Sequence, residues 1–290
     1  MNDAQKEIRR VAVLAHQALM SADGLAKDVE QHLSSKGVEV RLGGLGDNAF
    51  AQSVLREEND LVVALGGDGT MLRAGELAAE SATPVLGINM GRLGFLMEVK
   101  RENWRHAIDR VLQGEYWLEP RARIAATLFR EEEEIGRWEA LNECVVGRGR
   151  TARPIRVQAE VDDHYLATYV ADAVICATAT GSTAYALAAG GPILPPQLRN
   201  MLLVPVAPHL SADEAIVLPE NATLIMKVGE GPPVDLSCDG WLHHEMAPGD
   251  RVEVMASPED ALFVRLEDPG YFFRNLTKYV NHDPPATGRI

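Results

Sequence analysis

The sequence predicts an α/β domain with a Rossmann-like parallel sheet at the N-terminus, followed by an all-β sandwich domain. In the first 120 residues, short apolar runs alternate with segments whose apolar residues recur at helical spacing. From 121 to 269, strand-like segments follow one another at short intervals, separated by turn signals and without long helices. A chain of 290 residues is long enough for two such domains, each with its own core.

The first domain, residues 1–120, is predicted to repeat a strand–helix pattern. In its first helix, Leu25, Val29 and Leu33 share one face, and Gly37 follows the helix end. The predicted strands are 11–15, 38–40, 61–65 and 84–89, and the predicted helices are 21–36, 47–59, 70–77 and 103–113.

The second domain, residues 121–269, is predicted to be an antiparallel sandwich. The acidic run at 131–134 is predicted to be a solvated turn between two strands. Apolar residues at helical spacing after Tyr271 predict a helix within 270–290 that docks back on the first domain. The predicted strands are 124–128, 138–146, 155–161, 165–169, 173–177, 201–206, 222–228, 234–238, 251–255 and 262–266.

The composition argues against several classes of protein. A formal net charge of −14 argues against nucleic-acid binding, and no apolar segment has the length that a membrane span requires. Residues 1–10 are polar and lack the apolar core of a signal peptide. The cysteines, Cys144, Cys176 and Cys238, are widely spaced and odd in number. This pattern predicts reduced thiols, no cysteine-based metal site and a cytoplasmic protein.

Three glycines surround Asp68 directly after the strand at 61–65. Gly66, Gly67 and Gly69 can adopt positive φ and allow a ligand close to the backbone. The carboxyl end of a parallel strand is also where open α/β sheets bind ligands. Alternatively, the segment is an ordinary turn and Asp68 caps the following helix. The sequence contains neither G-x-x-x-x-G-K-[ST] nor G-x-G-x-x-G, so a P-loop and the usual dinucleotide fingerprint are unsupported.

Two adjacent polar residues, Asn142 and Glu143, lie within the predicted strand 138–146. Successive side chains of a strand point to opposite faces, so simple alternation would bury one of the two. A buried polar side chain needs a partner, which is either a strand-end hydrogen bond or a ligand.

A hydroxyl-rich turn at 178–183 leads into a short alanine-rich helix. It offers four hydroxyl groups and the N–H donors of a helix N-terminus, which suit phosphate oxygens or ribose hydroxyls. Ser182 or Thr183 could also serve as the cap of that helix.

Three motifs follow one another along the chain: G-G-D-G-T at 66–70, the pair Asn142-Glu143, and T-G-S-T-A-Y at 180–185 followed by G-G-P at 190–192. In order and spacing they resemble the NAD kinase family, within the superfamily that includes diacylglycerol and sphingosine kinases. The first motif also occurs in phosphofructokinases and lipid kinases, whereas its combination with T-G-S-T-A-Y is highly specific. The resemblance covers nearly the whole chain.

The resemblance implies transfer of the γ-phosphoryl group of ATP to the 2′-hydroxyl of the adenosine ribose of NAD, giving NADP. The general base of the family corresponds to Asp68, and a carboxylate on a glycine turn suits that role because it can reach a ribose hydroxyl. Mg²⁺ or another divalent metal ion is implied to arrive with ATP, so no protein ligands of a metal are assigned. The resemblance also implies a homodimer or homotetramer, with a site in the cleft between the two domains that a neighbouring subunit completes.

The resemblance assigns contacts with NAD or ATP to residues in both domains. Asn142 and Glu143 correspond to contacts with the adenine and ribose of NAD, and Tyr185 to a contact with the base. The full set is Gly67, Asp68, Gly69, Thr70, Arg73, Phe95, Asn142, Glu143, Arg153, Asp172, Thr180, Thr183, Ala184, Tyr185, Ala188, Ala207 and Asp239.

Several residues of this set have an ordinary structural explanation as well. Phe95 and Ala207, taken alone, look like packing residues, and Asp172 looks like the first residue of a strand. The pair Asp239-Gly240 is first of all a β-hairpin turn signal.

The sequence departs from the family pattern at three places. Ala179 replaces the proline of T-P-T-G-S-T, Val170 replaces an arginine found in many bacterial members, and 210–214 replaces serine-leucine and arginine-proline. Loss of an arginine near a diphosphate removes a charged hydrogen bond worth about 1.5–3 kcal/mol. Arg73 and Arg153 are candidates to replace it, although both could be surface residues.

Two other functions remain open from the sequence. One is a lipid or sphingoid-base kinase of the same superfamily, against which the T-G-S-T-A-Y element counts. The other is a catalytically silent nucleotide-binding regulator, which the changes at Val170 and 213–214 would fit.

Overall fold

The computed structural model describes residues 7–15, 24–45, 58–91, 94–150, 152–209 and 212–280. These residues fall into two units, one formed by the chain up to Glu119 and from Phe263 onward, the other by Pro120–Leu262. The chain passes from one unit to the other within β6 (Trp117–Arg121) and returns within β19 (Ala261–Arg265).

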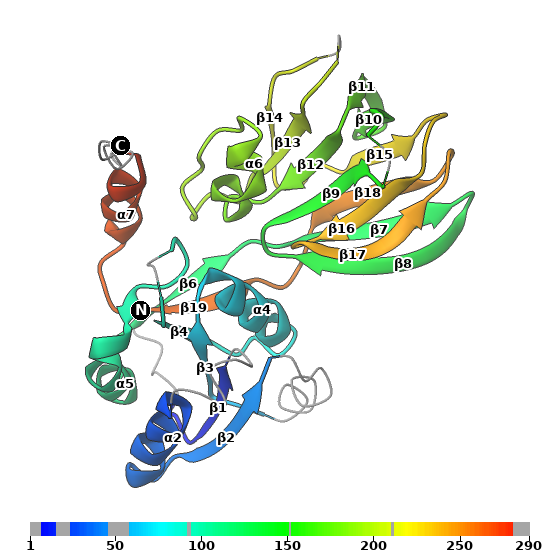
Figure 1. Cartoon of the computed structure of the whole chain (residues 1–290). Helices are drawn as coiled ribbons and strands as arrows, with labels where there is room; N and C mark the ends of the chain where they lie inside the picture. Colours follow the sequence, from blue (N-terminus) through cyan, green and yellow to red (C-terminus); the bar gives the residue numbers. More distant parts are fainter. Residues whose placement is uncertain are drawn as a thin grey trace, which may run out of the picture. The chain divides into compact units, whose positions relative to one another are not determined.

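The first unit contains a mostly parallel sheet of seven strands in the order β2-β1-β3-β4-β19-β6, with β5 paired to β4 (Figure 1). All six residues of the central strand β3 are buried, as expected for a strand that is covered on both faces. The remaining strands and the helices of this unit are β1 (Arg10–Ala15), α2 (Leu25–Ser35), β2 (Glu39–Gly44), β3 (Leu61–Gly66), α4 (Asp68–Ala79), β4 (Val85–Asn89), β5 (Val99–Lys100), a 3₁₀ turn (Arg101–Asn103), α5 (Trp104–Leu112) and α7 (Tyr271–Val280).

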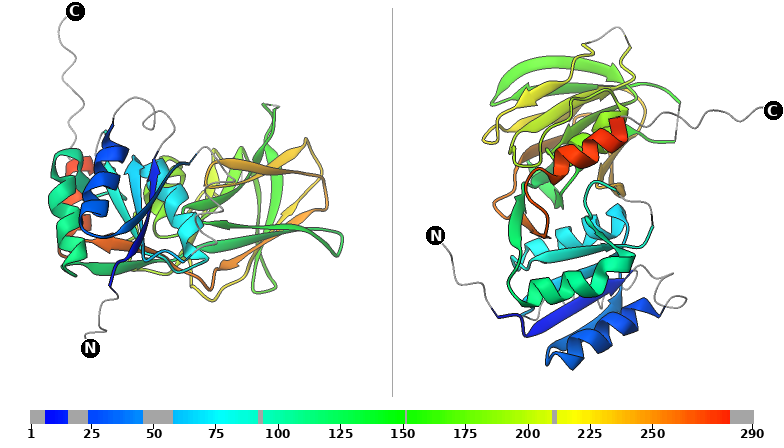
Figure 2. Two further views of the ribbon diagram at one scale, coloured as in Figure 1. Left: turned by 90° about the horizontal axis from the view of Figure 1, so that it is seen from below. Right: turned by 90° about the vertical axis from the view of Figure 1, so that its left-hand side faces the viewer.

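Helices cover both faces of this sheet (Figure 2). Leu86 and Ile88 of β4 share one apolar cluster with the buried faces of α2 and α5. Gly87 therefore points to the opposite face, where a Cβ on it would lie 2.8 Å from Met71 of α4. The amphipathic spacing seen in the sequence thus places α2 and α5 on one face and α4 on the other.

The second unit consists of two six-stranded antiparallel sheets with a shared apolar core (Figure 1). One sheet has the order β11-β10-β15-β18-β7-β8 and the other has the order β14-β13-β12-β9-β16-β17. The strands are β7 (Ile124–Arg130), β8 (Glu133–Ala140), β9 (Glu143–Arg148), β10 (Ile155–Val161), β11 (His164–Ala171), β12 (Ala173–Ala177), β13 (Met201–Val206), β14 (Ile216–Leu218), β15 (Leu224–Val228), β16 (Val234–Cys238), β17 (Trp241–Met246) and β18 (Arg251–Ala256).

The sheet that contains β12 is covered on both faces. Val174 and Cys176 of β12 contribute to the core between the two sheets. Ile175 and Ala177 point the other way, into a second cluster that includes residues of the alanine-rich segment. The members from that segment are Ala179, Ala186 and Leu194. The segment 179–194, which contains the third motif, therefore packs on the outer face of this sheet, and its helix α6 (Tyr185–Ala188) is only four residues long.

The predicted fold class is confirmed, and most predicted strands form within one or two residues of the expected bounds. One prediction about strand pairing is wrong. The strand expected at 262–266 does form, as β19, but it pairs in parallel with β4 of the mixed sheet and does not join the antiparallel sheets. Pairing partners depend on the whole topology, which an apolar run does not reveal.

A second correction concerns the segment 138–146, which was predicted to be one strand. The chain leaves strand geometry at Leu141 and Asn142, so that β8 ends at Ala140 and β9 begins at Glu143. Of the acidic run, only Glu131 and Glu132 form the turn, and the following two glutamates begin β8. Most of the helix predicted at 47–59, and the predicted helix start at Ser21, lie outside the described residues.

Within the described parts of the chain, no helix is both long and apolar enough to cross a membrane. Strands β5, β6, β14 and β17 are additions that the sequence pattern did not predict.

Candidate functional site

Asp68 is the first residue of α4 and follows directly on the turn after β3. The N-cap of α4 is Gly67, and no side chain caps this helix. The Asp68 carboxylate instead accepts the backbone N–H of Phe95 on Oδ2, at 2.7 Å, and that of Leu96 on Oδ1, at 3.2 Å. The helix-capping interpretation of Asp68 is therefore wrong, because the carboxylate joins the glycine turn to a second loop.

The glycines around Asp68 allow close packing and leave open space, and they do not supply a positive φ. Neither Gly66, Gly67 nor Gly69 has a positive φ. A Cβ on Gly66 would lie 2.0 Å from Thr70 Oγ1, so glycine there lets α4 pack closely on β3. A Cβ on Gly67 or Gly69 would meet no atom within 4 Å, so open space lies above these two residues. A ligand can therefore approach the backbone beside Asp68.

Asp239 holds the break between β8 and β9. Its carboxylate accepts the backbone N–H groups of Leu141 at 2.7 Å, Asn142 at 2.8 Å and Glu143 at 3.0 Å. The backbone N–H of Asp239 in turn donates to the carbonyl oxygen of Glu143 at 3.0 Å. Three N–H groups that have no partner in a sheet ladder are thereby satisfied by one side chain.

Asp239 and Gly240 form the two-residue turn between β16 and β17, as the hairpin signal predicted. Both have positive φ, at 48° and 81°, which is the backbone of the twist-matched hairpin turns. The same turn that closes the hairpin also carries the carboxylate that holds Asn142 and Glu143. Asp239 thus supports the candidate site through the backbone.

Glu143 is the buried member of the Asn142-Glu143 pair, with 7% of its surface exposed. Burial, and next the charge of Asp239, raise the pKa of Glu143 to about 7, although the backbone N–H of Tyr185 donates to its carboxyl group. Its Oε2 atom is buried and has no hydrogen-bond partner. Such an orphaned acceptor is a place where a ligand hydroxyl or a water would be bound.

The hydroxyl-rich turn packs directly on this pair. Thr178 donates its hydroxyl to Leu141 O at 2.6 Å and its backbone N–H to Asn142 O at 2.8 Å. A Cβ on Gly181 would lie 2.1 Å from Asn142 O, so only glycine fits there. The third motif and the second motif are thus one local structure, although they lie about 40 residues apart in the sequence.

The proposed caps of the alanine-rich helix are not observed. Ser182 is fully buried, donates to Ala179 O at 2.6 Å and accepts the backbone N–H of Leu194 at 2.9 Å. Thr183 donates to Thr180 O at 3.2 Å. Helix α6 has four residues and no side-chain cap, so its N-terminus offers little dipole to an anion.

Asp172 and Ala207 lie at the other end of β9 and β12. The backbone N–H of Asp172 donates to Val206 O, and its carbonyl oxygen accepts the N–H of Arg148, both at 2.9 Å. The Arg148 Nε lies 3.3 Å from Asp172 Oδ2. At about 3.3 Å per residue, the length of β12 separates Asp172 from the Asn142-Glu143 pair by roughly 15–20 Å.

The ion-pair partner of Asp172 in the structure is Arg148, and not one of the two arginines considered as replacements for the missing family arginine. Arg73 forms an ion pair with Glu76 on the same helix, at 2.7 Å. Arg153 is exposed in the loop before β10. The arginine beside Asp172 is Arg148. Its place in the run G-R-G-R after an apolar strand was a signal in the sequence that was not used.

The predicted residues therefore fall into three groups. Gly67, Asp68, Gly69, Thr70 and Phe95 meet in the first unit. In the second unit, the group around Glu143 comprises Asn142, Glu143, Thr180, Thr183, Ala184, Tyr185 and Asp239, with Ala188 exposed at the end of α6. Asp172 and Ala207 form the third group. Arg73 lies further along α4 than the first group, and Arg153 lies in the loop before β10.

Arg121 is a further residue of the Glu143 group that sequence reasoning missed. It is buried, and its guanidinium donates to Thr180 Oγ1 at 3.0 Å. A charged residue beside an apolar strand, as in Arg121-Ala122-Arg123-Ile124, was the available signal.

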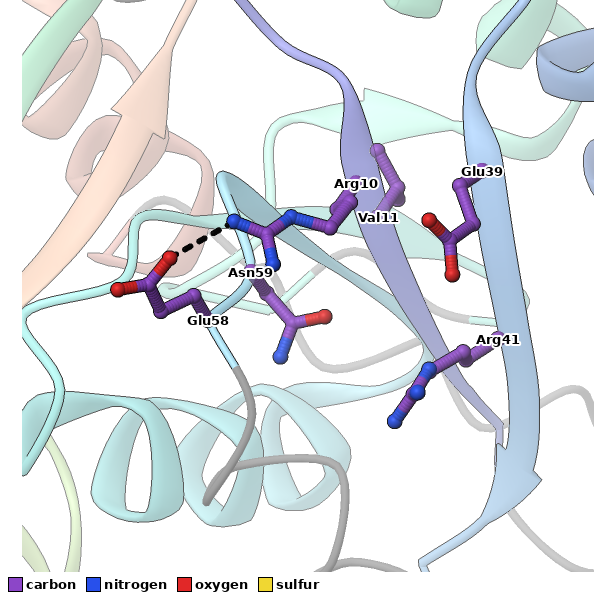
Figure 3. A pocket seen from close by; sticks show the side chains of 6 residues that line it. All are labelled: Arg10, Val11, Glu39, Arg41, Glu58 and Asn59. Atoms are coloured by element: carbon purple, nitrogen blue, oxygen red, sulfur yellow. Dashed lines mark hydrogen bonds and ion pairs between the residues drawn. The ribbon is translucent and has the colours of Figure 1, made fainter.

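A pocket of about 90 Å³ lies in the first unit at the amino ends of β1, β2 and β3, away from Asp68 (Figure 3). Arg10 and Glu58 in its wall form an ion pair at 2.9 Å. Because the three strands are parallel, this is the edge of the sheet opposite to Asp68. Ligands of open α/β sheets bind at the carboxyl edge, so this pocket is not part of the candidate site.

The described cysteines and acidic residues do not form a metal centre. All three cysteines are free and buried, and burial above all raises the pKa of the Cys176 thiol to about 12. Among the described residues, no group of three His, Cys, Asp or Glu side chains could hold a metal ion.

A Gly94→Ala substitution tests the packing of the loop at Gly94 against the Asp68 carboxylate. The added Cβ would lie 1.9 Å from Asp68 Oδ2, so the loop must move and the free energy of unfolding should fall by about 1–3 kcal/mol. Urea denaturation measures this. Gly91→Ala is the control, because a Cβ there meets no atom within 4 Å. Equal midpoints for the two variants would show that the loop does not rest on Asp68.

A Glu143→Gln substitution tests the buried carboxyl group. The native pKa of about 7 lies above the usual 4.5, so between these values the native state keeps a proton that the unfolded state loses. The stability of the natural protein should therefore fall as the pH rises from about 4.5 to 7, and the glutamine variant should lack that loss. Relative to that of the natural protein, the unfolding free energy of the glutamine variant should therefore rise by about 2 kcal/mol from pH 5 to pH 8. The exposed Glu102→Gln is the control, and parallel pH profiles for all three proteins would contradict the prediction.

Comparison with known proteins agrees with the three motifs. Residues 7–116 match the ATP-NAD kinase N-terminal domain, and residues 141–266 match the ATP-NAD kinase C-terminal domain. An NAD kinase of Chloroflexus aggregans is 38% identical over 269 residues, which is 93% of this chain and 97% of that protein. An NAD kinase of Symbiobacterium thermophilum is 38% identical over 260 residues, covering 87% and 91% of the two chains.

Solved structures show the same architecture. The crystal structure of an NAD kinase from Archaeoglobus fulgidus in complex with ATP superposes with a TM-score of 0.75 at 28% identity, covering 93% of this chain and 98% of that one. The yeast NADH kinase complexed with NADH has a TM-score of 0.85 at 23% identity, covering 99% and 91%, and supports the fold alone. The two domain matches and the relatives that align over most of the chain establish that the protein belongs to the NAD kinase family.

Proposed function

We propose that the chain transfers the γ-phosphoryl group of ATP to the 2′-hydroxyl of the adenosine ribose of NAD, with Asp68 as the general base. The observation that carries this assignment is the Asp68 carboxylate, fixed by two backbone N–H groups beside open space at Gly67 and Gly69. In the reaction the O2′–H bond breaks, its proton passes to Asp68, the O2′–P bond forms and ADP leaves.

The hydrogen bonds to Asp68 are compatible with a base. Each carboxylate oxygen has two lone-pair positions, so accepting one N–H leaves one position on each oxygen for a proton. The two bonds also fix the rotation of the carboxylate before substrate arrives. Phosphoryl transfer depends mainly on such positioning, because its loose transition state requires little covalent help from the protein.

We assign recognition of NAD to the group around Glu143. The orphaned Oε2 of Glu143 would accept a ribose hydroxyl, and the side chain of Asn142 would bind the adenine. Tyr185 is 43% exposed, which leaves its ring available for stacking on a base. Thr183, Ala184 and Ala188 follow the same turn and would line the nucleotide.

A divalent metal ion would come with ATP. Because the described residues offer no metal-binding group of their own, the ATP phosphates would supply most of its ligands. Bound there, Mg²⁺ would neutralise charge on the phosphate oxygens. The free, buried thiols support a reducing, cytoplasmic location.

We assign Asp172 and Arg148 to the site of a second copy of the chain in a homodimer or homotetramer. Within one chain, roughly 15–20 Å of β12 lies between Asp172 and Glu143, so the two do not converge on one small group. A carboxylate paired with an arginine, both only partly buried at the end of the sheet, is a surface that a neighbouring copy can use.

Replacement of Asp68 by Asn should lower turnover about 10²–10⁴-fold, the usual contribution of a general base. Turnover is measured as NADP formed from NAD, ATP and Mg²⁺, coupled to an NADP-specific dehydrogenase. Glu80→Gln, an exposed change of the same kind at the end of α4, should leave turnover unchanged. Full turnover in the Asp68→Asn protein would remove Asp68 from the role of base.

A mixture of two defective proteins tests the contribution of Asp172 across subunits. Asp68→Asn and Asp172→Ala chains are co-expressed with different tags, and the mixed oligomer is isolated by both tags. If each site takes Asp68 from one copy and Asp172 from another, half of the sites in a mixed dimer are intact, and about half of the natural activity should return. Activity no higher than the mean of the two defective proteins would place Asp172 outside the neighbour's site.

A further inference from the structure

A buried ionic cluster lies in the first unit, next to the loop that binds Asp68. It consists of Glu119 on β6, Arg265 at the end of β19 and Tyr271 at the start of α7, each with 1% of its surface exposed. Arg265 Nε donates to Glu119 Oε2 at 2.7 Å, and the Tyr271 hydroxyl donates to the same oxygen at 2.8 Å. The Arg265 guanidinium also lies 4.6 Å from the centre of the Tyr271 ring.

Burying this cluster costs the solvation free energy of its charged groups. An ion pair removed from water gains little net stability over apolar residues of similar volume, and its best-attested use is to fix one arrangement of the chain. Burial alone would lower the pKa of Arg265, but Tyr271, Glu119 and Glu98 together raise it, so the arginine stays charged. The charged guanidinium of Arg265 can therefore hold a specific hydrogen-bond acceptor.

That acceptor belongs to Leu96, the residue whose backbone N–H binds Asp68. Arg265 Nη1 donates to the carbonyl oxygen of Leu96 at 2.8 Å. The backbone N–H of the same Leu96 donates to Asp68 Oδ1 at 3.2 Å. Leu96 is thus held from both sides, by the arginine on its carbonyl and by the carboxylate on its N–H.

A second contact fixes the same loop to the same strand end. The Glu98 carboxylate accepts the backbone N–H groups of Leu266 and Glu267, the latter at 3.2 Å. Residues 96–98 are consequently attached to residues 265–267 at two points. This leaves the Leu96 N–H little freedom to turn away from Asp68.

We propose that Arg265, Glu119 and Tyr271 are positioning residues for the reaction, acting through Leu96 on the orientation of the Asp68 carboxylate. This inference rests on the proposed role of Asp68 as the base. None of the three touches substrate in this scheme. Arg265 orients Leu96, Glu119 orients Arg265, and Tyr271 holds Glu119 while attaching α7 to the cluster.

Three substitutions of graded severity test the proposal. Tyr271→Phe removes one hydroxyl from Glu119 and should lower kcat about three- to tenfold. Arg265→Met removes the donor to Leu96 and should lower kcat about 10–100-fold, since a small misplacement of a reacting group has effects of that size. Arg265→Lys keeps the charge but cannot donate in two fixed directions, so its kcat should lie between the two. The KM for NAD should change less than about twofold in all three.

Two control variants separate positioning from general loss of stability. Tyr169→Phe also removes a buried tyrosine hydroxyl, but one that has no hydrogen-bond partner. Ile108→Val loosens the core of the first unit without touching the cluster. Both should keep the natural kcat. Equal losses of kcat in variants and controls of matched melting temperature would overturn the proposal.

A double-mutant cycle with Asp68→Asn tests the route of action. If Arg265 acts through Asp68, Arg265→Met should lower kcat far less in the Asp68→Asn background than in the natural protein. Independent, multiplying losses would overturn the proposal. In parallel, the ¹H–¹⁵N resonance of Leu96 should shift in Tyr271→Phe and Arg265→Met and stay in place in Tyr169→Phe.

These readouts distinguish failure of the inference from failure of the proposed function. An Asp68→Asn protein with natural kcat would refute Asp68 as the base, and with it catalysis through Asp68. A Leu96 resonance that does not respond to either cluster substitution would refute the positioning network even if Asp68 is the base.

Discussion

Hydrogen bonds from backbone N–H groups to an aspartate carboxylate hold both parts of the candidate site. Asp68 accepts two such bonds from the loop between β4 and β5, and Asp239 accepts three from the break between β8 and β9. N–H groups at such places have no ladder partner, and an aspartate can satisfy several of them with one side chain. These backbone hydrogen bonds fix the direction of the remaining lone pairs of Asp68. They also fix the backbone of Asn142 and Glu143 beside Asp239, so neither arrangement depends on side-chain rotamers alone.

The features that sequence alone could predict are those written locally in the chain. The buried strand at 61–65, the turn that presents Asp68 and the hairpin at Asp239-Gly240 all follow from residue type and spacing. Alternation along a strand also predicted that one member of the Asn142-Glu143 pair is buried, and Glu143 is that member. These predictions needed no knowledge of distant partners.

The features that sequence did not predict depend on contacts between distant residues. The strand at 262–266 has the pattern of a sandwich strand, yet its partner is β4, about 180 residues away. Arg121 and Arg148 look like surface charges until Thr180 and Asp172 are placed beside them. The glycines around Asp68 provide close packing at Gly66 and open space at Gly67 and Gly69, and the positive φ expected of them is absent.

The position of β19 has a consequence for the order in which the protein is made. In the first sheet β19 lies between β4 and β6, so the last strand to leave the ribosome fills a gap in the middle of a sheet whose other strands were synthesised first. The second unit is continuous from Pro120 to Leu262 and is therefore complete before that gap can close. Until then Glu119 has no Arg265, and the loop at Leu96 has no anchor. A nascent or C-terminally truncated chain would thus contain all of the second unit while the sheet of the first unit still lacks β19 and the Arg265 contact with Leu96.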